Sequence, residues 1–133
     1  MGAIVLDSSI VLALFDTKDA HHARAAEIVR RHRRARSRFV VPASVFSEVL
    51  VGAHRQGRET VARRRRQMRD TFGSPRTIDE DVAVAAADLR GRYPGLRLPD
   101  AFVVAVAVVD RAEEVLTADK RLAKVDERVR VVG

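Results

Sequence analysis

Four short apolar runs interrupt a chain whose other apolar residues mostly recur at helical spacing. A short run that is rich in β-branched residues and bounded by polar ones predicts a strand buried in a sheet. The first run, Ile4-Val5-Leu6, ends abruptly at Asp7 and is followed by two serines. Strands are predicted at residues 4–6, 39–41, 114–117 and 129–132, the last at an edge of the sheet, and residues 76–78 are a possible short strand.

Between these runs, apolar residues recur every three or four positions, which predicts helices. Ser8 or Ser9 is expected to cap the first helix, and Asp79 a later one. Segment 100–110 is ambiguous: its valines favour a strand, but its length, its alanines and Pro99 favour a helix buried nearly all round, which we adopt. Helices are predicted at residues 10–15, 19–34, 43–55, 59–71, 82–90 and 100–110, with a loop at 91–99 and a helical turn at 120–124.

The alternation of strands and helices predicts a sheet whose strands run mainly parallel, covered by helices on both faces. We therefore expect an α/β fold, a three-layer α/β/α sandwich forming a single domain over residues 1–133. In open parallel sheets, ligands bind outside the carboxyl ends of the strands. Asp7, at the end of the first predicted strand, falls at such a position.

Composition narrows the classes of function. With 133 residues, 47% of them hydrophobic, the chain can form a substantial core, and without cysteine it can form neither disulfides nor thiolate metal sites. It lacks a bilayer-length apolar run and a secretory pattern, so we expect no membrane association and a cytoplasmic location. Its formal net charge of +7 favours a polyanionic partner such as nucleic acid.

Four carboxylates occupy positions that packing alone does not explain. Asp7 and Asp119 follow predicted strands, Glu48 lies within an apolar predicted helix, and Asp100 opens another. Buried carboxylates repel one another unless a proton or a cation lies between them. Mg²⁺, with Mn²⁺ as a plausible substitute, prefers oxygen ligands of this kind. The pattern predicts a metal site for phosphodiester hydrolysis, with the basic surface holding the nucleic-acid backbone.

Four short motifs, in this order over almost the whole chain, carry a family resemblance. They are Val5-Leu6-Asp7-Ser8-Ser9 with Leu12-Ala13-Leu14, Ser47-Glu48-Val49, Leu98-Pro99-Asp100-Ala101, and Leu116-Thr117-Ala118-Asp119-Lys120-Arg121-Leu122. The sequence resembles the PIN-domain ribonucleases of the VapC type, which are toxins of bacterial toxin–antitoxin pairs. The resemblance implies a PIN-like fold and metal-dependent endonucleolytic cleavage of RNA.

The resemblance also implies roles for individual residues. Asp7 and Asp100 would be the main magnesium ligands, and Asp119 would contact the metal directly or through water. Glu48 would position or activate the attacking water. The catalytic set is then Asp7, Glu48, Asp100 and Asp119, supported by the polar residues Ser9 and Thr117.

The resemblance further implies a homodimer that a cognate VapB-like antitoxin inhibits, in a heterotetramer or larger assembly, by occluding or distorting the acidic pocket. An alternative function is that of a binding module that acts with its antitoxin as a corepressor at operator DNA. A receiver-like phosphoacceptor domain would also carry an acidic pocket on a parallel sheet. This chain lacks the acidic pair and the suitably placed lysine of that class.

Each candidate also has an ordinary structural explanation. Asp7 and Asp119 could only cap helices, Asp100 suits the dipole of a helix start, and Glu48 could point into solvent. The arginine runs at 30–38 and 63–66 are typical of solvated faces, although one of them could bind RNA or the antitoxin. The few aromatic residues argue against a platform on which single-stranded bases stack.

Overall fold

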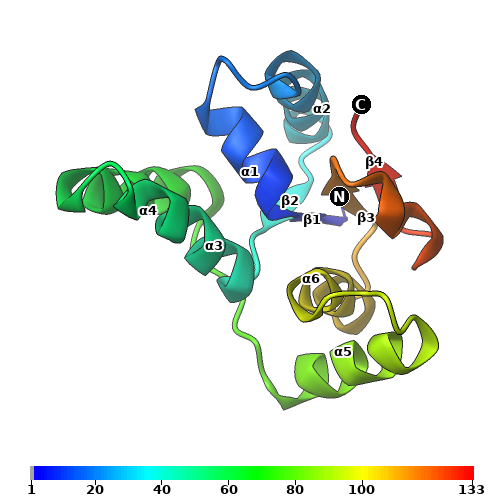
Figure 1. Cartoon of the computed structure of the whole chain (residues 1–133). Helices are drawn as coiled ribbons and strands as arrows, with labels where there is room; N and C mark the ends of the chain where they lie inside the picture. Colours follow the sequence, from blue (N-terminus) through cyan, green and yellow to red (C-terminus); the bar gives the residue numbers. More distant parts are fainter. Residues whose placement is uncertain (1) are drawn as a thin grey trace.

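A computed structural model of the chain describes residues 2–133. Within this range, four strands form one parallel sheet in the order β2-β1-β3-β4 (Figure 1). The α/β class with a central parallel sheet is therefore confirmed. Residue 1, which the predicted domain includes, lies outside the described residues. The strands are β1 (Ala3–Leu6), β2 (Arg38–Val40), β3 (Glu114–Thr117) and β4 (Val129–Val131).

Strand β1 lies at the centre of the sheet because its side chains are apolar on both faces. All four of its residues are buried, as expected for a parallel strand that helices cover from both sides. Val5 pairs with Val40 of β2 on one side and with Val115 of β3 on the other. The backbone N–H of Asp7 still donates to the carbonyl of Leu116, so the residue after β1 is held at the carboxyl edge of the sheet.

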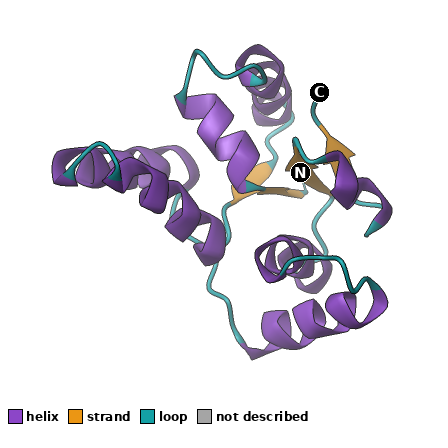
Figure 2. Ribbon diagram, viewed as in Figure 1, coloured by secondary structure: helices purple, strands orange, loops and turns teal. Residues whose placement is uncertain are grey.

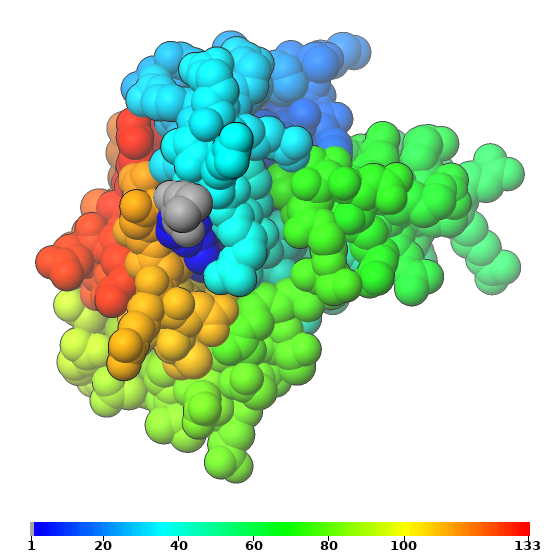
Figure 3. All heavy atoms as spheres, turned by 180° about the vertical axis from the view of Figure 1, so that it is seen from behind, coloured from blue at the N-terminus to red at the C-terminus, as the bar shows by residue number. Residues whose placement is uncertain are grey.

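Helices form the two outer layers (Figure 2). One face of the sheet is covered by α1 and α2 and the other by α6, with α5 packed on the outer side of α6. Helices α3 and α4 form a pair that projects from the body of the molecule (Figures 1 and 3). The helices are α1 (Ser8–Phe15), α2 (His22–Arg34), α3 (Ala43–His54), α4 (Arg58–Phe72), α5 (Glu80–Arg92), α6 (Leu98–Val109) and the 3-10 turn η1 (Lys120–Lys124).

Helix α6 resolves the ambiguous valine-rich segment in favour of the helix. Pro99 lies in its first turn, where no backbone donor is needed. Val103 and Val104 are fully buried, because α6 lies between the sheet and α5. A helix enclosed in this way is apolar on all sides, which is why its sequence also looked like a strand.

Two local predictions were wrong at helix starts. Asp7, rather than Ser8 or Ser9, caps α1, because the Asp7 side chain itself accepts from the backbone N–H of Ser8. Helix α2 begins at His22 rather than at residue 19. The Asp19 side chain accepts from the backbone N–H of His21, and such a local side-chain bond competes with helix formation.

The predicted strand at 76–78 was also wrong. Only an isolated bridge joins Arg76 to Pro42, and Pro42 has no N–H with which to extend a ladder. Helix α5 begins at Glu80 with Asp79 as its cap, as predicted, but it runs on to Arg92 and shortens the predicted loop.

Arg76 instead fastens three elements together. Its guanidinium group donates to both carboxylate oxygens of Asp110, at 3.0 and 2.8 Å, and to Asp79 at 2.8 Å. Asp110 ends α6 and Asp79 caps α5, while the Arg76 backbone bonds to both sides of Pro42, just before α3. The two acidic partners raise the pKa of Arg76 further above its usual range. This one side chain thus fixes the α5–α6 pair relative to the start of α3.

Replacing Arg76 with alanine is expected to lower the free energy of unfolding by about 1–3 kcal/mol, because the half-buried Asp110 loses its charged donor. Arg76→Lys should fall between wild type and Arg76→Ala, since lysine cannot form the two-pronged contact. Urea denaturation measures both. The control is Arg24→Ala, which removes an exposed pair with Glu27 and is expected to change stability by less than about 1 kcal/mol. Equal losses in the two alanine variants would contradict the role of Arg76.

Candidate active site

Asp7 is buried at the carboxyl edge of the sheet and its carboxylate is held by three donors. The backbone N–H of Ser8 donates to Oδ1 at 2.8 Å, and the hydroxyls of Thr117 and Ser9 donate to Oδ2 at 2.7 and 3.2 Å. An ionised carboxylate offers about four acceptor positions. One position on Oδ1 therefore remains available to a further ligand, in an orientation that the three bonds fix.

Thr117 and Ser9 extend these bonds into the chain that follows β3. The Thr117 hydroxyl, which is fully buried, also accepts from the backbone N–H of Asp119 at 3.0 Å. The Ser9 hydroxyl accepts from the backbone N–H of Ala118 at 3.0 Å. The network joins residues as much as 110 positions apart, so the start of α1 and the end of β3 are placed as one unit.

Asp100 lies in the first turn of α6 and is half-buried. Burial and the charge of Asp7 raise its pKa above the usual range, Asp119 adds to this, and Arg97 opposes it. The Arg97 Nε atom lies 3.4 Å from Oδ2 of Asp100. Asp7 and Asp100 thus lie close enough for their charges to interact.

Glu48 is on the exposed side of α3, since Val45 and Val49 occupy the buried side. The expectation that apolar residues surround it holds for the sequence but not for the folded helix. Partial burial of the carboxyl group and then the charges of Asp7 and Asp100 raise the pKa of Glu48. Its side chain therefore reaches the neighbourhood of both aspartates while water has access to it.

Asp119 has a different environment from the other three acids. It caps η1 by accepting from the backbone N–H of Arg121, whose guanidinium also contacts both carboxylate oxygens at 3.1 and 2.9 Å. These bonds lower the pKa of Asp119. Asp119 is thus a cap with its own counterion, and its charge adds a small contribution to the raised pKa of Asp100.

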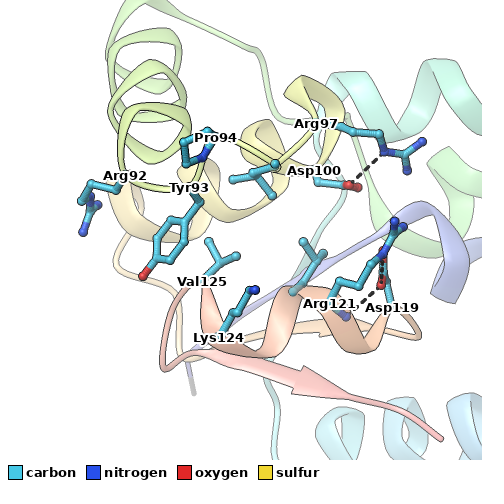
Figure 4. Close-up of a pocket in the computed structure, with 12 residues that line it drawn as sticks. Arg92, Tyr93, Pro94, Arg97, Asp100, Asp119, Arg121, Lys124 and Val125 are labelled. Carbon is cyan, nitrogen blue, oxygen red and sulfur yellow. Dashed lines mark hydrogen bonds and ion pairs between the residues drawn. The ribbon is translucent and has the colours of Figure 1, made fainter.

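Asp100 and Asp119 face each other across a pocket of about 310 Å³ (Figure 4). Arg97 and Arg121, which sequence reasoning did not single out, each hold one of these two acids. Arg97 lies three positions before Asp100, and Arg121 lies two positions after Asp119. This spacing was the only sign of the two pairings in the sequence. Within residues 2–133, no three His, Asp or Glu side chains are already grouped tightly enough to hold one metal ion. The charges of Asp7 and Asp100 act on Glu48, and those of Asp7 and Asp119 act on Asp100, while the predicted metal-binding role of Asp7, Asp100 and Asp119 stays a prediction.

A comparison with family models decides the class of this chain. The model described as PIN domain matches residues 4–128. The chain belongs to the PIN-domain family. PIN domains are typically nucleases, and they generally use divalent metals. The resemblance seen in the motifs is therefore confirmed for the PIN-domain family. A comparison with curated proteins gives no match.

Solved structures share this PIN fold along nearly their whole length. A toxin–antitoxin complex from Klebsiella pneumoniae is 22% identical, covers 98% of both chains and has a TM-score of 0.73. VapBC2 from Rickettsia felis, bound to a DNA fragment from its promoter, is 11% identical with a TM-score of 0.74 and covers 98% of this chain and 99% of its own. VapC20 from Mycobacterium tuberculosis, described as a toxin that cleaves the sarcin–ricin loop, is 18% identical and has a TM-score of 0.72. The match covers 90% of this chain and 92% of VapC20. At these identities the likeness concerns the fold.

The helices give no sign of a membrane span. Among residues 2–133, none combines the length and the apolar character that crossing a bilayer requires.

Thr117→Val tests the buried network. Valine has nearly the same shape but leaves Asp7 and the Asp119 N–H without their partner, so the free energy of unfolding should fall by about 1–3 kcal/mol. Urea denaturation measures the change. The matched control is Thr60→Val in α4, where the hydroxyl makes only long bonds, donating to the Gln56 carbonyl at 3.3 Å and accepting from Arg63 at 3.4 Å, and the expected change is below about 1 kcal/mol. A Thr117→Val protein as stable as wild type would show that the network does not hold the fold together.

Proposed function

We propose that this PIN domain, spanning the whole chain, is a magnesium-dependent endoribonuclease and the toxin of a VapBC-type toxin–antitoxin system. The observation that carries the proposal is the mutual repulsion of Asp7, Glu48 and Asp100. Burial raises the pKa of both Glu48 and Asp100, the charge of Asp7 raises it further, and such charge is relieved when a divalent cation binds. The class of reaction is hydrolysis of RNA phosphodiester bonds.

The donor set fits a hard cation. Asp7 contributes its remaining Oδ1 position, and Asp100 and Asp119 contribute carboxylates once they turn away from Arg97 and Arg121. Oxygen ligands of this kind suit Mg²⁺, and Mn²⁺ is a plausible substitute. A bound magnesium ion would neutralise the acids, lower the pKa of a water molecule and offset charge on the phosphate.

Glu48 is the residue that we assign to proton transfer. Its raised pKa strengthens its affinity for a proton relative to an ordinary glutamate, which suits a general base that acts on water. Its exposure allows water to reach the carboxylate. Ser9 and Thr117 would not react themselves, because their hydroxyls are engaged in orienting Asp7.

Regulation by a partner is part of the proposal. Structures with the same fold include a toxin–antitoxin complex from Klebsiella pneumoniae and VapBC2 from Rickettsia felis. By analogy, we expect a homodimer that a VapB-like antitoxin neutralises in a heterotetramer or a larger assembly.

RNA cleavage by the pure protein tests the proposal. Asp7→Asn should reduce the cleavage rate at least about 100-fold and weaken Mg²⁺ binding in calorimetry, while the fold survives because asparagine is as good a helix cap as aspartate. Glu48→Gln should reduce the cleavage rate and retain Mg²⁺ binding, since its assigned role is with water. EDTA should abolish cleavage by the wild type.

The matched control is Asp81→Asn, the same chemical change at an exposed carboxylate in the first turn of α5. It should cleave RNA like the wild type. Cleavage that persists in EDTA and in Asp7→Asn would reject the mechanism.

A second function, as a corepressor with the antitoxin, is favoured by one comparison, since VapBC2 with the same fold was solved on promoter DNA. We expect the antitoxin to bind its operator more tightly when this chain is present. Gel-shift titration of operator DNA with the antitoxin, alone and with this chain, measures the difference. Identical affinities would exclude the corepressor function and leave the nuclease proposal untouched.

A further inference from the structure

We propose that the pocket lined by Asp100 and Asp119 is a base-binding subsite, in which one nucleobase of an RNA strand stacks on Tyr93. The inference deepens the proposed nuclease function and rests on it for the identity of the ligand. It assigns Tyr93 to positioning the substrate and Lys124 to contacting its phosphate backbone.

The pocket has an apolar floor and one aromatic wall. Leu96, Leu122 and Val125 are buried and form the floor between the loop before α6 and η1. Tyr93 and Val125 both line the pocket, with Tyr93 at one end of it, and Tyr93 is half-buried (Figure 4). An apolar pocket with an aromatic ring in its wall is suited to a base, which stacks on such rings whatever its identity.

The rim of the pocket carries the opposite charge to that of a nucleic-acid backbone. Arg92, Arg97, Arg121 and Lys124 are all exposed and line the same pocket. Exposed cations in this arrangement bind phosphate groups, and arginine does so with two parallel hydrogen bonds. The combination of an apolar pocket and a basic rim distinguishes a nucleotide from a purely apolar ligand.

The pocket is continuous with the candidate active site. Asp100 and Asp119 line one end of it, and Tyr93 lines the other (Figure 4). A base that enters beside Tyr93 therefore directs its flanking phosphate toward the two acids. Binding in the pocket thus places a phosphodiester bond where the proposed chemistry occurs, which is how positioning contributes to a reaction rate.

The wall that carries Tyr93 is held in place by hydrogen bonds. The backbone N–H of Leu96 donates to the Tyr93 carbonyl at 2.9 Å, which closes a tight turn. The Arg90 side chain donates to the Leu96 carbonyl at 2.9 Å and fastens this turn to α5. The pocket is therefore preorganised. Because Tyr93 is the only tyrosine in the chain, it serves one base and does not form an extended stacking platform.

Substitution of Tyr93 tests the stacking. The probe is a fluorescein-labelled single-stranded RNA of about 12 nucleotides, titrated in EDTA and followed by fluorescence anisotropy. Tyr93→Ala is expected to bind about tenfold more weakly, and Tyr93→Phe, which keeps the ring, within about twofold of the wild type. With an oligomer of the same length that lacks bases, wild type and Tyr93→Ala should bind equally.

Lys124→Ala tests the phosphate contact, with Lys120→Ala as its matched control. Both lysines are exposed on η1, but only Lys124 lines the pocket among the described residues. Lys124→Ala should lower the slope of log affinity against log salt by about 0.7, the value for one phosphate contact to a single strand. Lys120→Ala should leave the slope unchanged.

Cleavage in Mg²⁺ separates this inference from the proposed function. A protein that cleaves RNA while Tyr93→Ala matches the wild type in affinity and in kcat/KM would overturn the subsite and leave the nuclease intact. A protein that does not cleave RNA but loses affinity in Tyr93→Ala, and not in Tyr93→Phe, would support the subsite and reject the nuclease. Wild-type protein that binds neither oligomer would overturn the subsite.

Discussion

The buried hydrogen bond from the Thr117 hydroxyl to Asp7 is the constraint on which the candidate site depends. It joins the ends of two adjacent parallel strands and, through Ser9, the start of α1. Parallel pairing of β1 and β3 brings both strand ends to one edge, and the hydroxyl then fixes the carboxylate there. Because both groups are removed from water, losing either partner would leave the other unsatisfied. Hydrogen bonds within the protein thus fix the orientation of the Asp7 carboxylate.

Much of the fold followed from local pattern. The strand at 114–117 and the turn at 120–124 matched the structure at both ends, because abrupt changes between apolar and polar residues bound them. The predicted starts of α1 and α2 were wrong, because the side chains of Asp7 and Asp19 accept hydrogen bonds from the backbone N–H groups of Ser8 and His21. The spacing of apolar residues does not reveal such bonds. Segment 76–78 looked like a strand but lies beside Pro42, which prevents further pairing.

The candidate site was predictable in part. The rule that parallel strands end at one edge predicted Asp7 at the rim of the sheet, and the structure then places Asp119 after the neighbouring strand and Asp100 at the start of α6. Sequence could not show that Arg97 and Arg121 pair with two of these acids, since that depends on where flexible side chains reach. Nor could it show that Tyr93 lines the other end of the same pocket, because Tyr93 fell in a predicted loop without a motif. The small number of aromatic residues predicts no stacking platform for single-stranded bases, and this prediction is compatible with a subsite for one base.

Strand β4 has a consequence for the behaviour of the protein in concentrated solution. Its outer edge pairs with no further strand in residues 2–133, and unpaired edges invite strands of other molecules. This edge is three residues long and has Arg130 at its centre, where an ion pair with Glu114 holds the charge in place. A short, charged edge is a poor template for intermolecular sheet growth. The apolar sheet is thereby protected against aggregation through its β4 edge.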